Sequence, residues 1–501
     1  MFQKFKSLFG AQDMTVGKPL GVMMRFAIPL LFGNIAQLMY NIVDSMVVGR
    51  MINSNALAAV GASAPIQQLF FVFFMAVGTG VSVMVAQYFG AKDKERLSQT
   101  IGGAMTLTFI VTAFVTVIGI IFTSPILRLT NVTDPEMFRF AKDYLFWTFV
   151  GTIGQGYYNI LSGILRGMGE SIFPLFVLIG TAILNVLLDI WMVATPEQLS
   201  FGPIVGLNWG VAGAAIATTV CQYLSAFVCF IRLRQLNEYA VINRDTLRPR
   251  KIIVLQIVRI GIPSGIQQAV LSMSSLLVQS LINSIAIIDA AGMVSYTIFA
   301  ACNVAVSKVD NIAMLPNQAF SMAGSTFAGQ NIGAGKMDRV RKGFNIILLT
   351  SLAVSAVLIV VISIWGGNLM ELFIDVNRDP NASIIIKYGV QMQRIMVWCY
   401  IAMSFTQASS GVLRGAGDTF PVMIITIIGT VGMRMPMAYL MVHLSKKTAE
   451  FPAGNPSGVY WSMLICFSLV AGACALYYKM GKWKDKVLVR HNTKEPITDG
   501  E

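Results

Sequence analysis

Long apolar runs without charged residues constrain the fold of this chain more than any other feature. Between Arg25 and Arg50 there is a single charge, Asp44, and between Met51 and Ala91 there is none. An α-helix rises about 1.5 Å per residue, so about 20 apolar residues cross the roughly 30 Å hydrocarbon core of a bilayer. Such runs recur to the end of the chain. We therefore predict an all-α polytopic membrane protein with twelve transmembrane helices.

The composition excludes several other classes of protein. Of 501 residues, 55% are hydrophobic and 12% are charged, about half the charged fraction of a soluble domain. The net charge of +13 comes mainly from basic loop residues, so we expect no nucleic acid partner. Two histidines cannot build a histidine metal site, and the six cysteines lie in apolar runs without CxxC spacing. No HExxH or GxSxG motif is present, and we expect neither an enzyme nor a cofactor.

Three motifs of the first half recur in the same order in the second half. The pairs are LRGMGES at 165–171 with LRGAGDT at 413–419, QYFGA at 87–91 with QNIGA at 330–334, and RFAIP at 25–29 with RIGIP at 259–263. Ordered matches of this kind indicate an internal duplication. Because each half holds an even number of predicted helices, the halves enter the membrane from the same side as parallel repeats. Transporters built this way bind their ligand between the repeats.

The repeat predicts the domain boundaries. We expect an N-terminal lobe of helices 1–6 at residues 1–235, a hinge at 236–250, a C-terminal lobe of helices 7–12 at 251–485, and a tail at 486–501. Expected helix centres lie near Leu38, Phe73, Phe109, Thr152, Leu184, Ala217, Val270, Ser307, Val354, Tyr400, Ile428 and Phe467. Most Lys and Arg residues outside these helices fall in the hinge, in the tail and in loops on their side. The positive-inside rule then places both termini in the cytoplasm of a multi-pass plasma (inner) membrane protein.

Two acidic residues lie deep in predicted first-lobe helices. Asp44 follows Tyr40 by one helical turn, and Asp189 follows Asn185 by the same spacing, so each pair shares a helix face. A carboxylate at the centre of a bilayer costs about 2.5–3.5 kcal/mol on insertion scales, and such residues mark ion or proton sites. Two alternatives are open: Asp44 is solvated near its helix end, or Asn185 and Asp189 form a structural polar network.

These features together resemble the multidrug and toxic compound extrusion (MATE) family, and its DinF-like branch most of all. The resemblance is carried by the six-plus-six repeat, VDSMVVGR at 43–50, the twin LRGxG[ED][ST] loops and the two QxxGA motifs. It covers nearly the whole chain. It implies a V-shaped bundle of two lobes around a central cavity, and export of drug-like, often cationic, compounds against inward H⁺ or Na⁺.

The resemblance also implies roles for individual residues. Asp44, with Tyr40 before it, matches the first-helix aspartate of the DinF-like and archaeal branches, and Asn185 with Asp189 matches their fifth-helix pair. These residues would bind the coupling proton, or Na⁺ at Asp44, Asn185 and Asp189; no other metal is expected. Thr218 in GAAIATTV matches a hydroxyl ligand, although Thr219 is adjacent, and Pro29 matches a helix-bending proline. Prolines are also common in membrane helices for structural reasons, and Pro263 repeats Pro29 without a coupled acid.

The second lobe departs from the sodium-coupled branch of that family, which carries acids in helices seven and ten. Arg434 is the repeat counterpart of Asn185, and helix ten has Arg394 in place of an acid. Lys308 and Asp310 are predicted to lie deep in helix eight, with one of them paired to Arg434. This second-lobe polar network is either structural or in contact with substrate.

We therefore expect a secondary active multidrug or organic-cation efflux transporter that works as an H⁺ or Na⁺ antiporter by alternating access. Its expected partners are small, cationic, drug-like substrates and membrane lipids, and the expected state is a monomer. The alternative is a flippase for a lipid-linked or polysaccharide precursor from the same superfamily. A flippase would need basic residues to bind phosphates, whereas the first lobe offers acids.

Overall fold

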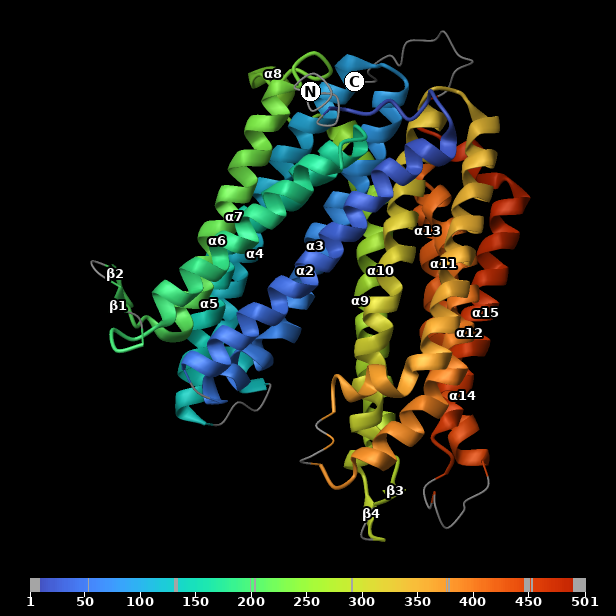
Figure 1. Cartoon of the computed structure of the whole chain (residues 1–501). Coiled ribbons are helices and arrows are strands. Elements are labelled where there is room, and N and C mark those ends of the chain that lie inside the picture. The colour runs from blue at the N-terminus through green and yellow to red at the C-terminus, as the bar shows by residue number, and fades with distance from the viewer. Residues whose placement is uncertain are drawn as a thin grey trace.

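The structure is a computed structural model dominated by long α-helices. It describes residues 10–52, 54–129, 134–198, 200–201, 204–289, 292–374, 376, 379–445, 451 and 454–489. In this part of the chain each half supplies six long helices (Figure 1). The prediction of an all-α protein with two six-helix repeats is confirmed.

The first half forms α2 to α7. Their bounds are α2 Pro19–Met51, α3 Ser54–Gly90, α4 Lys94–Leu129, α5 Pro135–Gly167, α6 Ile172–Val193 and α7 Gly210–Gln235. The 37 residues of α3 correspond to the charge-free run that begins at Met51. The short helix α8 (Arg244–Leu247) lies in the linker to the second half.

The second half forms α9 to α15, followed by a short 3-10 helix. The bounds are α9 Lys251–Asn283, α10 Thr297–Gly333, α11 Met337–Glu371, α12 Ala382–Gly415, α13 Thr419–Ile427, α14 Arg434–Leu444, α15 Ser457–Met480 and η2 Lys482–Lys486. A π-helical turn, η1 (Ile428–Met433), joins α13 to α14, so these three elements make one interrupted span. The repeat-related helix α6 has no such interruption.

Two short hairpins were not predicted. One pairs β1 (Ser200–Phe201) with β2 (Ile204–Val205), and the other pairs β3 (Ile287–Ile288) with β4 (Val294–Ser295). Strands of two residues are too short to produce a period-two pattern in the sequence. Both hairpins lie at the end of the molecule opposite α8 (Figure 1).

Helices α5 and α12 occupy repeat-related positions inside their own bundles. Ten helices of the described chain are long and apolar enough to cross a membrane, but these two are not among them. Helix α5 packs against α3, α4 and α7, and α12 packs against α10, α11 and α15. A helix surrounded by protein needs few lipid-facing apolar residues, so its mean hydropathy is lower. At Gly154 of α5 an added Cβ would lie 2.8 Å from the backbone nitrogen of Tyr223 in α7, so only glycine permits this approach.

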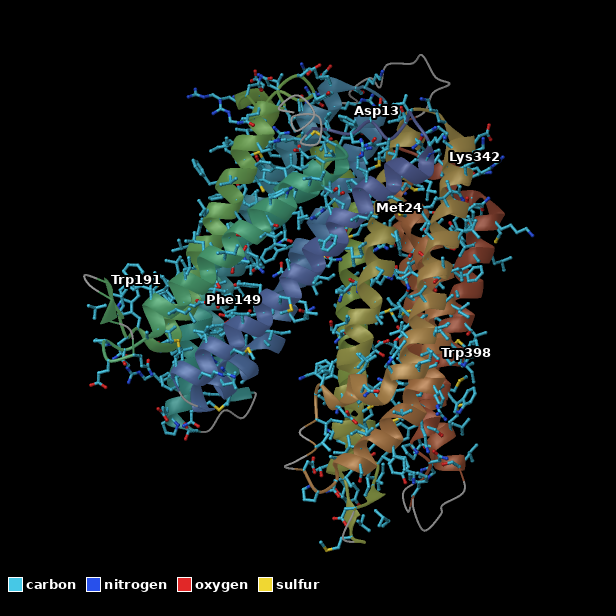
Figure 2. All side chains as sticks on the ribbon, in the orientation of Figure 1. Asp13, Met24, Phe149, Trp191, Lys342 and Trp398 are labelled. Carbon is cyan, nitrogen blue, oxygen red and sulfur yellow. The ribbon has the colours of Figure 1, made fainter. Side chains whose placement is uncertain are left out.

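The two bundles form a V (Figure 1). They converge at the end that carries α8, Asp13 and Lys342, and they separate toward the end that carries the hairpins and Trp191 (Figures 1 and 2). At the convergent end, α3 packs against α9 and α10, and α2 packs against α10 and α11. We call this the closed end.

Glycines of the repeated QxxGA motif allow close backbone contacts between the bundles. A Cβ added to Gly333 would lie 1.9 Å from the carbonyl oxygen of Gln87, and one added to Gly90 would lie 2.0 Å from that of Gln330. No side chain fits at either place, which explains why both halves keep glycine there.

The glutamines of the same motif bind the glycine of the LRGxG motif in the opposite bundle. Gln87 Nε2 donates to the carbonyl oxygen of Gly415 at 2.9 Å, and Gln330 Nε2 donates to that of Gly167 at 3.0 Å. Gln87 and Gln330 are both fully buried. The two repeated motifs therefore form a reciprocal pair of contacts, which we call the glutamine clasp.

The segments before α2 and after η2 complete the clasp. The amide of Met14 donates to Gln330 Oε1 at 2.8 Å, and the amide of Leu488 donates to Gln87 Oε1 at 3.1 Å. Lys336 and Arg339 bind further carbonyl groups of residues 14–17. Both segments are thus fixed to the closed end.

Candidate functional site

Helices α2, α6 and α7 bring the predicted first-lobe residues together. Helix α2 packs against α6, and the carboxyl groups of Asp44 and Asp189 lie within hydrogen-bonding reach of each other. The Tyr40 hydroxyl lies 3.2 Å from Thr218 Oγ1. We call Tyr40, Asp44, Asn185, Asp189 and Thr218 the acidic cluster.

Asn185 contacts both Asp189 on α6 and Thr218 on α7. Its amide is assigned with nitrogen toward Asp189, because Nδ2 then donates to Asp189 Oδ2 at 2.8 Å. The amide oxygen then accepts from the backbone nitrogen of Thr218 at 3.0 Å and from its hydroxyl at 3.3 Å. The neighbouring Thr219 instead donates to the carbonyl of Trp147 at 2.9 Å. Of the two adjacent threonines, Thr218 is the one that contacts the cluster.

The acidic cluster has unsatisfied oxygens. Oδ1 of Asp44 and Oδ1 of Asp189 are shielded from solvent and have no hydrogen-bond donor within the described residues. Asp189 is 0% exposed. Two buried carboxylates this close repel each other unless a proton or a cation lies between them. The arrangement is therefore suited to bind either one.

A small cavity adjoins the acidic cluster. It has a volume of about 30 Å³, enough for about two water molecules. Residues from α2, α5, α6 and α7 line it: Gln37, Tyr40, Tyr158, Leu178, Thr181, Ala182, Asn185, Cys221, Gln222 and Ser225. Most of these are polar, so water here can hydrogen bond to the protein and reach the cluster.

The sequence analysis missed Tyr144, which adjoins the cluster, and its neighbour Gln67. The Tyr144 side chain on α5 lies near both Asp44 and Asp189, and its hydroxyl is within hydrogen-bonding reach of Gln67 on α3. No spacing rule links residues on separate helices. The only available signal was a tyrosine and a glutamine inside predicted membrane helices.

Pro29 lies on α2, about four turns before Asp44. Helix α2 is continuous through it from Pro19 to Met51. Proline has no amide hydrogen, so the carbonyl of Arg25 loses its helical partner, which weakens this turn of the helix. Its proposed role in bending stays a prediction.

In the second lobe, Asp310 and Arg434 lie near each other but do not form a close ion pair. Asp310 lies beside Tyr400 and within the electrostatic influence of Arg434. No ion pair within 4.0 Å joins them in the described part of the chain. Arg434 Nη2 instead contacts the sulfur of Met463 at 3.4 Å. Oδ1 of Asp310 and Nε of Arg434 are buried without hydrogen-bond partners there.

Lys308 does not belong to this polar network, contrary to the prediction. Its side chain is exposed, and its Nζ lies 5.4 Å from the ring centre of Phe373. Residues two positions apart on a helix point in different directions, so Lys308 and Asp310 cannot share one face.

The described residues contain no group of three or more His, Cys, Asp or Glu side chains that could hold a metal ion. The acidic cluster instead combines two carboxyl groups with neutral oxygens from an amide and two hydroxyls. Hard oxygen ligands of this kind suit a proton or an alkali cation rather than a transition metal.

Known proteins with similar sequences include probable multidrug resistance proteins, and one with a similar fold is a MATE family transporter. The chain is 27% identical to "Probable multidrug resistance protein YoeA" of Bacillus subtilis (strain 168), over 93% of this chain and 95% of that protein. It is 25% identical to "Probable multidrug resistance protein NorM" of Thermotoga maritima, over 94% and 95% of the two chains. The fold matches the outward-facing conformation of a multidrug resistance MATE family transporter of the MOP superfamily with a TM-score of 0.81, at 22% identity over 94% and 97% of the chains.

The family profile itself matches both repeats. The MatE profile covers residues 29–191 and 263–440, which is more than half of the chain. Each matched segment begins at the repeated proline, at Pro29 and at Pro263, and the first includes both carboxyl groups of the acidic cluster. The chain belongs to the MatE family of multi-pass membrane transporters.

Proposed function

We propose that this protein exports organic cations of the multidrug class in exchange for H⁺ or Na⁺, and that the acidic cluster couples the two fluxes. The observation that carries the proposal is the pair of unsatisfied, buried carboxyl oxygens at Asp44 and Asp189. The names of the relatives YoeA and NorM support a drug-like cargo. We propose no enzymatic activity.

The proposed mechanism is alternating access. Arrival of a proton or Na⁺ between the two carboxyl groups removes their repulsion and changes the packing of α2 against α6. A coupling free energy of about 1–3 kcal/mol between ion and substrate is typical of such systems. An ion gradient supplies enough energy, about 2.3 kcal/mol per charge per 100 mV and about 1.4 kcal/mol per pH unit for protons.

We propose that the closed end faces the cytoplasm of the plasma membrane, with both termini on that side. The basic residues of the linker and of the neighbouring loops support this orientation. The V would then be open to the outside. The flippase alternative has less support, because the cluster between α2 and α6 is acidic and would repel phosphate.

The direct test is transport in proteoliposomes, with a pH gradient and a sodium gradient imposed separately. Uptake of a lipophilic cation should follow one of the gradients. Asp44→Asn and Asp189→Asn keep the side-chain size but remove the ionisable group. Each should reduce gradient-driven flux at least tenfold while purified yield and thermal stability change little.

Asp310→Asn is the matched control, because Asp310 is also a membrane-embedded acid with an unsatisfied oxygen. Its loss should affect yield more than coupling, since Arg434 would lose its nearby negative charge. Wild-type flux from Asp44→Asn, or ATP-dependent flux without any ion gradient, would contradict the proposed mechanism.

A further inference from the structure

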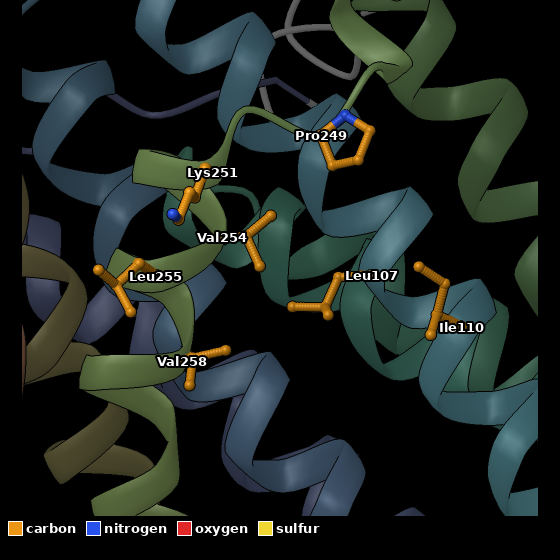
Figure 3. Close-up of a pocket in the computed structure, with 7 residues that line it drawn as sticks. All are labelled: Leu107, Ile110, Pro249, Lys251, Val254, Leu255 and Val258. Atoms are coloured by element: carbon orange, nitrogen blue, oxygen red, sulfur yellow. The ribbon is translucent and has the colours of Figure 1, made fainter. Parts of the chain in front are cut away.

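A groove outside the acidic cluster lies between α4 and α9, under the linker that joins the two halves. Its volume is about 330 Å³. Leu107 and Ile110 on α4 form one wall, and Val254 and Val258 on α9 face Leu107 from the other side (Figure 3). Because α4 belongs to the first bundle and α9 to the second, an occupant would contact both bundles.

The linker segment that covers the groove is fixed to α4 by hydrogen bonding and close packing. Thr106 Oγ1 on α4 donates to the carbonyl of Leu247 in α8 at 2.7 Å. A Cβ added to Gly102 on α4 would lie 2.0 Å from the carbonyl oxygen of Thr246, so the two backbones are in close contact. Asn243 and Thr246 cap α8 with reciprocal hydrogen bonds. The linker above the groove is therefore packed against α4.

The mouth of the groove is basic. Lys251 lines it together with Pro249, and Arg248 and Arg250 are the sequence neighbours of that proline. All three basic side chains are exposed, and none takes part in an ion pair within the described chain. Asp245 in α8 is the nearest carboxylate in the sequence, and it forms no ion pair with them there. Positive charge at this mouth is thus left for a ligand.

We propose that the groove binds one anionic phospholipid. Its acyl chain would lie along the apolar walls, and its phosphate would lie at Lys251, flanked by Arg248 and Arg250. Other occupants match only one of these two features. A free phosphate would not contact the apolar walls, and a zwitterionic lipid would not neutralise the positive charge at the mouth. Basic residues beside a membrane helix contribute roughly a fivefold factor each to binding of anionic lipid.

The test is lipid retention by the purified full-length protein, measured by native mass spectrometry. The probes are phosphatidylglycerol, phosphatidylcholine with the same acyl chains, and glycerol phosphate without chains. Wild-type protein should retain phosphatidylglycerol several-fold better than phosphatidylcholine and should not retain glycerol phosphate. Lys251→Gln should lower phosphatidylglycerol affinity about fivefold, and the triple variant with Arg248→Gln and Arg250→Gln roughly a hundredfold.

One further variant tests the contribution of the acyl chain to binding, and a second is a control for the loss of a basic charge elsewhere. Val258→Trp fills the groove and should reduce retention of both lipids, whereas Lys342→Gln removes an exposed lysine of α11 and should change nothing. Equal retention of the two lipids, retention of glycerol phosphate alone, or an unchanged triple variant would each overturn the proposal. No transport is measured, so failure here is distinct from failure of the efflux proposal.

Discussion

Gln330→Ala should open the closed end of the V. Gln330 is fully buried and uses both atoms of its amide: Nε2 donates to the carbonyl of Gly167 in the first bundle, and Oε1 accepts from the amide of Met14, which Asn331 and Arg339 hold to the second bundle. The carbonyl of Gly167 belongs to the last turn of α5, so no helical amide is available to replace the lost donor. Alanine leaves both groups without partners.

The size of the effect follows from the Gly167 carbonyl, because it is the partner that lies in the opposite bundle. A buried polar group left without a partner costs about 1–3 kcal/mol, so the closed arrangement should lose about 1–3 kcal/mol. When the bundles separate, water reaches this carbonyl and the cost disappears, so the penalty acts on the closed arrangement alone. A loss of about 2 kcal/mol changes the ratio of closed to open molecules about 30-fold.

Spin labels measure this change directly. One label replaces Lys94 at the start of α4 and the other replaces Lys342 on α11; both side chains are exposed, one in each bundle. The wild-type distance distribution should have one main component, and Gln330→Ala should add a longer one. Gln267→Ala is the control, because Gln267 donates to Thr426 within the second bundle. A distribution identical to wild type in Gln330→Ala would refute the assigned role of the glutamine clasp.

Three other predictions follow from contacts described above. Gly333→Ala places a Cβ 1.9 Å from a carbonyl oxygen of α3, so the two spin labels should move apart and the melting temperature should fall. Gly367 has open space around it, so Gly367→Ala should match wild type in both measurements. Thr218→Val breaks contacts to the acidic cluster and should impair ion-driven flux, while Thr219→Val, which loses a bond to α5, should cost about 1 kcal/mol of stability without impairing coupling. Burial raises the pKa of Glu170, and its arginine partner on α7, 2.8 Å away, only partly opposes this shift. Because the folded-state pKa of Glu170 lies above the unfolded one, the stabilising protonated form is lost as pH rises from the ordinary glutamate pKa of about 4.3 through the folded-state pKa. Wild-type stability should therefore fall relative to Glu170→Gln over that rise in pH, which thermal melts can check.

Much of the fold could be read from local properties of the sequence. The free energy of transferring apolar residues into a bilayer acts on each segment separately, so charge-free runs predicted the membrane helices. The repeated motifs predicted that both halves share one architecture. Helical periodicity placed Tyr40 beside Asp44 and Asn185 beside Asp189, because residues four apart share a face. The same rule, applied to Lys308 and Asp310, would have separated them.

Contacts between segments were decided by tertiary packing. Nothing local indicates that Asp44 meets Asp189, because the two lie on helices whose rotation about their axes depends on packing with several neighbours. The acids of the twin loops illustrate this dependence: Glu170 binds Arg232 on α7, whereas its counterpart Asp418 accepts a 2.6 Å hydrogen bond from Tyr477 on α15.

The repeated motifs themselves show where local sequence stops being informative. The sequence contains QxxGA and LRGxG twice, but their spacing gives no sign that each glutamine binds the glycine of the other repeat. That pairing arises because two parallel repeats related by an axis along the membrane normal bring equivalent helix ends together. The sequence alone determined which segments become helices and which residues are equivalent. Only the tertiary structure determined which of these residues touch, because contact depends on the mutual rotation and separation of whole bundles.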